Sequence, residues 1–519
     1  MKQGEDAENR DSEGQGGALA RFLDAIERVG NMVPHPAIIF FWLIGAVILS
    51  SVIFAALGTG ITYEFANPVT GEIETRTTEI RSLLSADGLA FMFTSPVANF
   101  LGFGAVGVII VAMIGVGVAD ESGLIATLVR KIVEVAPRSL FTFIVVMLGV
   151  VSSIAADAGY LVLVPLAAAA FHSLGRHPLA GLAAGFSGVA AVFLVNLFVT
   201  PTDALLVEMT NDAIALADPG RSITLVGNLY FMIASSIAIG IVCTIITEKI
   251  VEPRLGPYTG AATPEGTGNL TPQQARGLRH ALWALIGFVV VIGALTALPG
   301  APLRHPETGG ILSGSPFMSG LIVIISALFF TVGYAYGRGA GTIADLTAAI
   351  GMIVKTFSGL AGLIFLLLVI SQFIAFFNYT NMAVVLAANL ADLLETVPIG
   401  AVGYIIFFVL VVFIIDLIIT GAAAKWAILA PVFVPLFMRL GGDPDLVLAA
   451  YRVGDSPANV ITPLNVYLGV MVGFAAKYVK DAGIGTIVAL MLPYTLILLV
   501  LWTLLLIAWY LFDLPLGPA

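Results

Sequence analysis

An internal repeat is the feature of this sequence that most constrains its fold. Residues 156–188 align without a gap with residues 422–454, at an offset of 266. The identical pairs that fix this register include Ala158 with Ala424, Leu163 with Leu429, Pro165 with Pro431, Phe171 with Phe437, Gly175 with Gly441 and Pro178 with Pro444. In an apolar chain, paired segments that Gly and Pro interrupt, one in each half, indicate the binding site of a secondary transporter. The repeat therefore predicts a carrier built from two related halves.

The composition places the chain in a membrane. It is 59% hydrophobic and only 11% charged, with a mean hydropathy of +1.02, whereas soluble domains carry roughly 25% charged residues. The net charge of −10 and the scattered Lys and Arg residues leave no nucleic-acid footprint. Cys243 is the single cysteine, so no internal disulfide can form.

Nine apolar runs have about the 20 residues that a bilayer span requires. They are residues 37–57, 100–119, 179–199, 223–246, 281–298, 317–336, 352–377, 446–476 and 484–511. Two longer runs, 139–172 and 401–439, are interrupted at residues 157–159 and 421–423, and we interpret them as re-entrant helical hairpins. The predicted fold is an all-α polytopic membrane protein with about nine transmembrane helices, two hairpins and an inverted repeat.

The charged residues predict the orientation, because Lys and Arg accumulate in cytoplasmic loops. Arg21 and Arg28 place the N-terminus inside. The basic residues at the ends of the first hairpin, which place both its ends inside, are Arg130, Lys131, Arg138 and Arg176. The second hairpin is flanked by acidic residues, which place its ends outside: Asp392, Glu395, Asp443 and Asp445. The two repeats are therefore predicted to be inverted relative to each other.

Four segments follow from these assignments. Residues 1–36 are predicted to be a cytoplasmic, amphipathic N-terminal segment, either at the membrane interface or packed on the protein's own loops. Residues 37–247 form the first half with the first repeat, residues 248–280 a cytoplasmic linker, and residues 281–519 the second half.

Several long motifs resemble those of the AbgT family of p-aminobenzoyl-glutamate transporters. They are residues 27–31 (ERVGN), 34–36 (PHP), 153–160 (SIAADAGY), 424–431 (AKWAILAP) and 451–456 (YRVGDS). The resemblance covers nearly the whole chain. It implies a homodimer in a bacterial inner membrane, a transport core formed by the hairpins, and transport of p-aminobenzoyl-glutamate or export of sulfonamide antimetabolites. Asp416, and Pro457-Ala458, stand where members of the family often carry Asn and Ser-Thr.

Ionisable residues at membrane depth are functional candidates because an unpaired charge there costs several kcal/mol. The candidates are Asp157, Asp203, Asp416, Lys425, Arg452 and Asp455. Arg452 and Asp455 are three residues apart, so they share a helix face and are predicted to pair. Gly454, Pro457 and Pro463 predict an unwound stretch around them. Arg452 either binds a substrate carboxylate or forms a purely structural ion pair that holds a broken helix.

The aromatic residues of the repeat complete the predicted substrate site. Trp426 and its repeat mate Tyr160 follow the two hairpin breaks, where an aminobenzoyl ring would stack, although both are also common packing residues. Lys425 either binds a second substrate carboxylate or extends to water. The predicted substrate contacts are Arg452, Trp426, Asp455, Lys425, Tyr160, Pro444 and Pro463.

Proton or sodium coupling is predicted at the acidic and polar residues near the breaks. The candidates are Asp157, Asp203, Asp416, Asn196, Asn459 and Thr462, with a sodium site near Asn196 and Asn459 and no firm metal site. For each residue, helix capping or turn formation is the competing role. No phosphate loop, nucleophile elbow or metal-ligand spacing occurs, so we expect neither an enzyme nor a cofactor. The alternatives are a dicarboxylate carrier of the same architecture and a passive channel.

Overall fold

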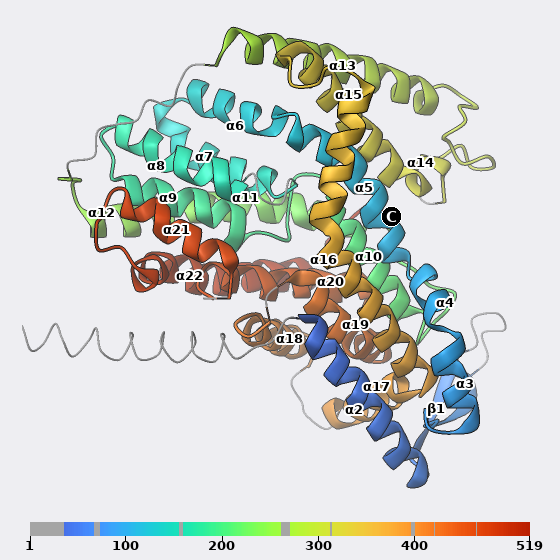
Figure 1. Ribbon diagram of the computed structural model, residues 1–519. Helices are drawn as coiled ribbons and strands as arrows, with labels where there is room; N and C mark the ends of the chain where they lie inside the picture. The colour runs from blue at the N-terminus through green and yellow to red at the C-terminus, as the bar shows by residue number, and fades with distance from the viewer. Residues whose placement is uncertain are drawn as a thin grey trace, which may run out of the picture.

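The computed structural model describes residues 36–66, 73–154, 159–260, 270–311, 314–395, 400–419, 421–462 and 464–518. The described chain is almost entirely helical (Figure 1). The helices of the first half are α2 (Pro36–Ala56), α3 (Ala86–Thr94), α4 (Pro96–Leu101), α5 (Gly104–Glu121), α6 (Leu124–Val135), η1 (Arg138–Leu140), α7 (Phe141–Ser152), η2 (Gly159–Leu163), α8 (Val164–Ser173), α9 (Pro178–Phe186), η3 (Ser187–Ala191), α10 (Pro201–Ile214), α11 (Leu229–Ile246), η4 (Thr247–Val251) and α12 (Glu252–Leu255).

The second half has the same character. Its helices are α13 (Pro272–Ala297), α14 (Pro316–Ser319), α15 (Leu321–Ala340), α16 (Leu346–Tyr379), α17 (Met382–Glu395), α18 (Gly400–Asp416), α19 (Ala422–Arg439), α20 (Pro444–Asp455), η5 (Ser456–Val460), α21 (Val466–Ala476) and α22 (Ile484–Leu511). The only strands of the described residues are β1 (Gly60–Ala66) and β2 (Ile73–Glu79), which form an antiparallel hairpin with Gly60 opposite Glu79. The sequence reading had missed this hairpin.

Eight of the described helices are long and apolar enough to cross a membrane. They are α2, α5, α11 with its continuation to Leu255, α13, α15, α16, α19 and α22, and the pair formed by residues 124–135 and 138–152, bent by 119°, would add a ninth. All but α19 correspond to predicted single spans. The all-α polytopic fold is thus confirmed.

The two remaining predicted spans, 179–199 and 446–476, are broken helices. In the first, α9 runs into the π-helical turn η3, and the chain is then irregular until α10 begins at Pro201. In the second, α20 runs into the 3-10 turn η5 before α21 begins at Val466. Such breaks free backbone N–H and C=O groups, which at membrane depth must line a cavity or find other partners.

The two predicted hairpins are each a pair of helices. α7 is followed by η2 and α8, and α18 by α19; a ring contact joins the arms in each case, Phe141 with Phe171 at 5.7 Å and Phe408 with Phe437 at 5.7 Å between centroids. The predicted break at Asp157 lies outside the described residues, as do Pro463 and residues 1–35 of the N-terminal segment.

The predicted linker 248–280 is shorter where it is described. The first half stays helical through α12, and α13 already begins at Pro272. Thr271 and Gln274 form a capping box, which satisfies backbone N–H groups at the start of α13.

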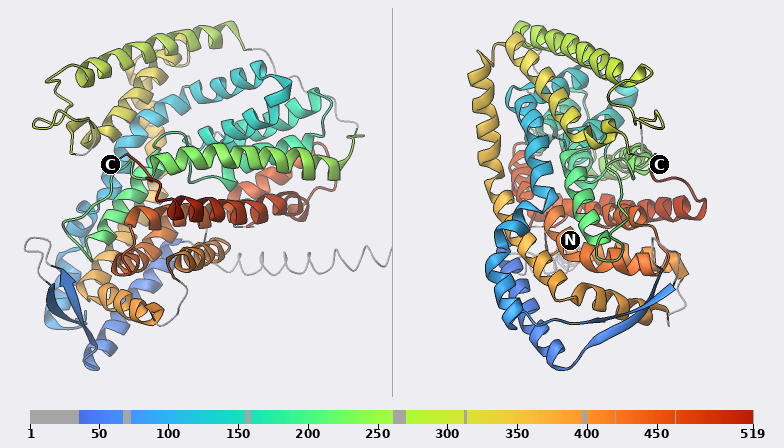
Figure 2. Two further views of the ribbon diagram at one scale, coloured as in Figure 1. Left: turned by 180° about the vertical axis from the view of Figure 1, so that it is seen from behind. Right: turned by 90° about the vertical axis from the view of Figure 1, so that its right-hand side faces the viewer.

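The helices form two groups (Figures 1 and 2). The hairpin α7–α8 lies with α9, α11, α21 and α22 on one side, while α2, α15 and α16 lie on the other. α5 packs against α15, α16 and α10, and α10 packs in turn against α19 and α20. α10 therefore connects the outer helices to the second hairpin.

The repeat extends to details of backbone geometry. Gly175 and Gly441 end the second hairpin arms with φ of 75° and 77°, the left-handed conformation that glycine adopts without strain. Two residues later, His177 and Asp443 cap the next helix in the same way, since each accepts a hydrogen bond from the backbone N–H two residues on. The aligned segments therefore fold alike.

A close helix contact also recurs in both halves. A Cβ placed on Gly188 would lie 2.3 Å from the carbonyl oxygen of Val146, and one on Gly454 would lie 2.6 Å from that of Val409 and 2.7 Å from Cβ of Val412. Val146 and Val412 are themselves 266 residues apart. Each broken helix thus packs directly on the first arm of its hairpin.

Substituting either glycine by alanine should therefore destabilise the protein. We expect Gly188→Ala and Gly454→Ala to cost about 1–3 kcal/mol each, because the methyl group forces the helices apart. Thermal unfolding of the purified protein measures this. Gly469→Ala is the matched control, since a Cβ at Gly469 meets nothing within 4 Å. Equal melting temperatures for all three variants would contradict the proposed contact.

Candidate functional site

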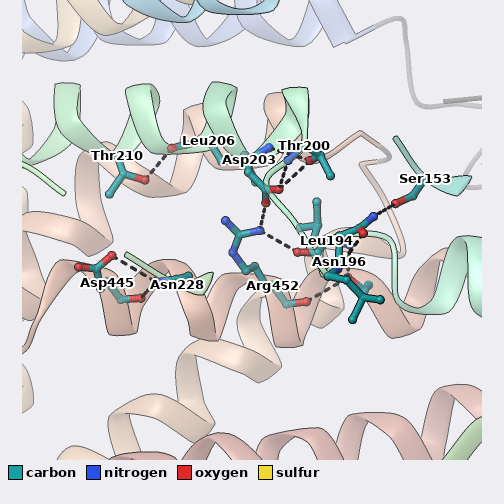
Figure 3. Close-up of polar contacts among 12 residues, drawn as sticks. Ser153, Leu194, Asn196, Thr200, Asp203, Leu206, Thr210, Asn228, Asp445 and Arg452 are labelled. Carbon is teal, nitrogen blue, oxygen red and sulfur yellow. Dashed lines mark hydrogen bonds and ion pairs between the residues drawn. The ribbon is translucent and has the colours of Figure 1, made fainter. Parts of the chain in front are cut away.

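A buried ion pair joins α20 to α10. Arg452 on α20 is 1% exposed, and its Nη1 donates to a carboxylate oxygen of Asp203 and, at 2.7 Å, to the carbonyl oxygen of Leu194 (Figure 3). The other oxygen of Asp203 accepts from the backbone N–H and the hydroxyl of Thr200, both at 2.7 Å. Asp203 therefore caps α10 and neutralises Arg452 at the same time.

The predicted pair between Arg452 and Asp455 is wrong. In the described residues Asp455 pairs instead with Lys425 on α19, at 2.6 Å. The helical spacing allowed an Arg452–Asp455 contact, but partners on neighbouring helices take both side chains because a buried charge needs a close opposite charge.

Lys425 links three helices. It is fully buried and forms ion pairs with Asp455 on α20 and with Asp416 at the end of α18. Neither predicted role, a contact with a substrate carboxylate or an extension to water, is what the structure shows. The hydroxyl of Tyr451 donates within the same cluster, at 2.8 Å to Asp455 and 2.6 Å to the carbonyl oxygen of Ala422.

Trp426 is part of the packing beneath this cluster. It is 0% exposed, its Nε1 donates to the hydroxyl of Thr210 on α10 at 3.0 Å, and its ring lies 4.5 Å from that of Tyr451. Trp426 lines none of the cavities considered below, so it supports the site rather than facing a ligand in this conformation. Sequence reasoning missed Thr210 and Tyr451, although Tyr451 begins the motif at 451–456.

A cavity of about 250 Å³ lies between the tips of the two hairpins, and we call it the tip cavity. Its lining combines both halves of the chain: Tyr160 and Phe193 from the first, and Gly421, Ala422, Asp455, Asn459, Leu464, Asn465, Val466 and Tyr467 from the second. Tyr160 and Tyr467 stack with their rings 3.9 Å apart and 2° from parallel. The predicted residues Tyr160, Asp455 and Asn459 thus meet at one site, and Tyr467 and Asn465 are additions.

The polar residues after the two helix breaks hold the hairpins. Asn196 donates to the carbonyl oxygen of Val150 at 2.8 Å and to the hydroxyl of Ser153 at 3.0 Å, and its own oxygen accepts from Leu197 at 2.8 Å. Its repeat mate Thr462 donates at 3.3 Å to the carbonyl oxygen of Leu417. Both residues therefore clamp the end of the first hairpin arm in their own half.

The sodium site predicted near Asn196 and Asn459 stays a prediction. Asn459 lines the tip cavity, whereas the hydrogen-bonding capacity of Asn196 is used within the first hairpin. Across the part of the chain that is described, no group of three or more His, Cys, Asp or Glu side chains could hold a metal ion. Pro444 is buried as the first residue of α20 and does not line the tip cavity.

The buried charges around α20 do not balance. Two cations, Arg452 and Lys425, face three carboxylates, Asp203, Asp416 and Asp455. If all five are ionised, the cluster carries one net negative charge in a region of low dielectric. Asp455 also lines the tip cavity. Its Oδ2 atom has no hydrogen-bond partner in the described structure.

Two hairpins of related sequence, two broken helices and a cavity where the hairpin tips meet are the arrangement of a membrane transporter of the inverted-repeat class. The sequence model of the AbgT putative transporter family matches residues 21–519, and the chain belongs to that family. It is a transporter and not an enzyme.

Three relatives support the assignment. The chain is 34% identical over 493 residues to the p-aminobenzoyl-glutamate transport protein of Escherichia coli strain K12, covering 95% of each chain. The crystal structure of the YdaH transporter of Alcanivorax borkumensis has a TM-score of 0.87 at 39% identity, covering 93% of this chain and 100% of that one. MtrF of Neisseria gonorrhoeae, described with a class of antimetabolite efflux pumps, has a TM-score of 0.89 at 38% identity, covering 96% and 99%.

Removing one member of the Arg452–Asp203 pair should lower the stability of the folded protein strongly, and removing both members should lower it less. We expect Arg452→Met to lose about 3–5 kcal/mol of stability because Asp203 is left as an uncompensated buried charge. Adding Asp203→Asn should restore part of that loss. Thermal unfolding of the two variants in detergent compares them directly.

The exposed pair of Lys131 and Glu134, at 3.0 Å, provides the control. Lys131→Met should change stability by less than about 1 kcal/mol, because solvent screens exposed pairs. A double variant less stable than Arg452→Met alone would show that the pair is not the source of the effect.

Proposed function

We propose that the protein is an ion-gradient-driven secondary transporter of p-aminobenzoyl-glutamate and related folate-pathway compounds, with sulfonamide antimetabolites as a second class of substrate. The Escherichia coli relative is named for transport of p-aminobenzoyl-glutamate, and the Neisseria gonorrhoeae relative is described with antimetabolite efflux pumps, the broader class to which sulfonamides belong. The two classes share a flat ring that carries a primary aromatic amine.

The tip cavity is the observation that carries this proposal. Tyr160 and Tyr467 stack on each other, and a substrate ring would stack on an outer face of this pair with centroids about 4.5–7 Å apart. Asp455 supplies a carboxylate that accepts hydrogen bonds from an aromatic amine, and the side-chain amides of Asn459 and Asn465 supply donors for the acyl or sulfonyl oxygens. A site with one aromatic wall and few polar groups is typical of small-molecule recognition.

Arg452 and Trp426 act through the residues that they hold. Arg452 fixes α20, which carries Asp455, to α10, and Trp426 fixes the start of α19 to the same helix. Their loss would therefore displace the lining of the tip cavity. In this proposal they are positioning residues rather than direct contacts.

The surplus negative charge of the buried cluster supports coupling to a cation gradient. A proton on one of the three carboxyls, or a sodium ion beside Asp455, would neutralise the cluster. Movement of one elementary charge through 100 mV provides about 2.3 kcal/mol, which corresponds to roughly a fifty-fold concentration ratio. One coupled cation per substrate is therefore sufficient for useful accumulation or export.

The proposal also includes the membrane, the orientation and the oligomeric state of the transporter. The distribution of Lys and Arg favours a cytoplasmic N-terminus, and the family resemblance supports a bacterial inner membrane. The family resemblance supports a homodimer. Motion of the hairpin-bearing helices against α2, α5, α15 and α16 would expose the tip cavity alternately to the two sides.

Uptake of labelled p-aminobenzoyl-glutamate into proteoliposomes tests the proposal. We expect saturable accumulation under a proton gradient or a sodium gradient and none without a gradient. Asp455→Asn should reduce accumulation at least about tenfold, because a rise of about 1.4 kcal/mol in the barrier to transport already slows the rate by that factor. Tyr467→Ala should raise the half-saturating concentration by removing the stacking face.

Gly469→Ala on the same helix, α21, is the control and should transport normally, since its added methyl group meets nothing. Flux that is unsaturable and independent of any gradient would indicate a channel. Accumulation of a simple dicarboxylate that competes with p-aminobenzoyl-glutamate, and that Tyr467→Ala leaves intact, would favour the dicarboxylate carrier instead.

A further inference from the structure

A second and larger cavity lies at the other end of the second hairpin. It has a volume of about 630 Å³, and we call it the base cavity. Its acidic lining residues are Asp443, Asp445 and Asp513, and its aromatic lining includes Tyr404 and Phe437. Neither the transport site nor the ion pairs around α20 use this cavity.

The corresponding position of the first repeat is filled by an arginine. Arg176 lies with its guanidinium carbon 4.1 Å above the ring of Phe171. It donates to Glu252 at 2.5, 2.9 and 3.2 Å, and to the hydroxyl of Thr142 at 2.8 Å, and it lies 3.5 Å from Glu248. The base of the first hairpin is thus closed by a cation between an aromatic face and carboxylates.

The second repeat has the same backbone without the arginine. Gly442 stands at the position of Arg176. The backbone N–H of Gly442 donates to the carbonyl oxygen of Phe437 at 2.8 Å, and that of Arg176 donates to the carbonyl oxygen of Phe171 at 2.8 Å. Phe437 is the repeat mate of Phe171 and lines the base cavity. The aromatic face is therefore kept, while the cation that covers it in the first repeat is replaced by space.

We propose that the base cavity binds a small organic cation, whose ammonium, amidinium or guanidinium group takes the place that the Arg176 side chain takes in the first repeat. The group lies over Phe437 and binds the carboxylate of Asp445, while Asp443 and Asp513 add negative charge elsewhere in the lining. An aromatic body on the ligand packs on the remaining apolar lining. A metal ion is not the occupant, since the described residues hold no group of side chains that could ligate one.

Asn228 holds Asp445 at the edge of the base cavity. Asn228 is 3% exposed and donates to the backbone oxygen of Asp445 at 3.0 Å and to its carboxylate at 3.2 Å (Figure 3). The oxygen of the Asn228 amide has no hydrogen-bond partner in the described structure. Asn228 does not line the base cavity itself, so its hydrogen bonds position the carboxylate of Asp445.

Arg221, a cation near the surface, does not fill the cavity. Arg221 lies 3.5 Å from Asp443, and the two side chains are 43% and 57% exposed, so water screens this pair. Arg452 lies on the same helix as Asp445 but is bound to Asp203. Among the described residues, no Lys, Arg or His forms a salt bridge with Asp445 or Asp513, so both contribute to an acidic lining.

Binding should strengthen as the pH rises. Asp445 precedes the predicted span 446–476, and burial, with the nearby Asp443 as the second cause, raises the pKa of its carboxyl to about 7, against the opposing charges of Arg452 and Arg221. Below this pH the carboxyl is protonated and uncharged, and above it the carboxylate attracts a cation. The affinity for a permanently protonated ligand should therefore increase between pH 6 and pH 8.

Calorimetric titration of the purified full-length protein with benzamidine tests the proposal, with benzamide as the uncharged isostere. We expect saturable binding of benzamidine, at least tenfold weaker binding of benzamide, and at least tenfold weaker binding of benzamidine to Asp445→Asn. The exposed Asp87, at the start of α3, provides the control variant Asp87→Asn, which removes the same charge outside the cavity and should bind normally.

The variant Gly442→Arg separates the proposal from a general charge effect. Because Gly442 and Arg176 share the same backbone hydrogen bond, the new side chain should enter the base cavity and abolish benzamidine binding while all three carboxylates remain. A melting temperature at or above that of the parent would show that the variant folds. No binding to the parent protein, equal binding of benzamide, or unchanged binding by Gly442→Arg and Asp445→Asn would each overturn the proposal.

Discussion

The pairing of buried charges on α20 is the constraint on which the centre of this transporter depends. A charged side chain in a region of low dielectric is tolerated only beside an opposite charge. Arg452 therefore fixes α20 to α10, and Asp455 fixes it through Lys425 to α19 and α18. These contacts set where α20 ends and where the tip cavity lies, since Asp455 is both the last residue of the helix and part of the cavity wall.

The two repeats share a backbone but not their chemistry. Lys425, Arg452 and Asp455 in the second repeat stand opposite Gly159, Phe186 and Val189 in the first. The first half contributes Asp203, which lies beyond the aligned segment, and the aromatic faces of Tyr160 and Phe193. The inverted repeat thus supplies two similar hairpin supports, while the second half carries most of the charge that the proposed coupling requires.

Structural features that follow from the length of apolar runs or from the internal repeat could be predicted from the sequence. Long apolar runs and aligned glycines and prolines were enough for the spans, the hairpins and the meeting of Tyr160 with Asp455. The pairing of Arg452 could not be predicted, because helical spacing describes contacts within one helix and says nothing of Asp203, 249 residues away. Thr210 and Tyr451 are single polar groups within helices and leave no pattern. The strands β1 and β2 were missed because a short, polar segment with many threonines also suits a loop.

The second hairpin joins the two cavities physically. The start of α19, at Ala422, lines the tip cavity, and Phe437, near its end, lines the base cavity. At 1.5 Å per residue its 18 residues span about 27 Å. Pro431 and Pro435 lie within the helix, and each removes a backbone hydrogen bond and favours bending there. A change in the tilt of α19 therefore alters both cavities together, so a cation bound at the base of the hairpin would favour one position of its tip over another.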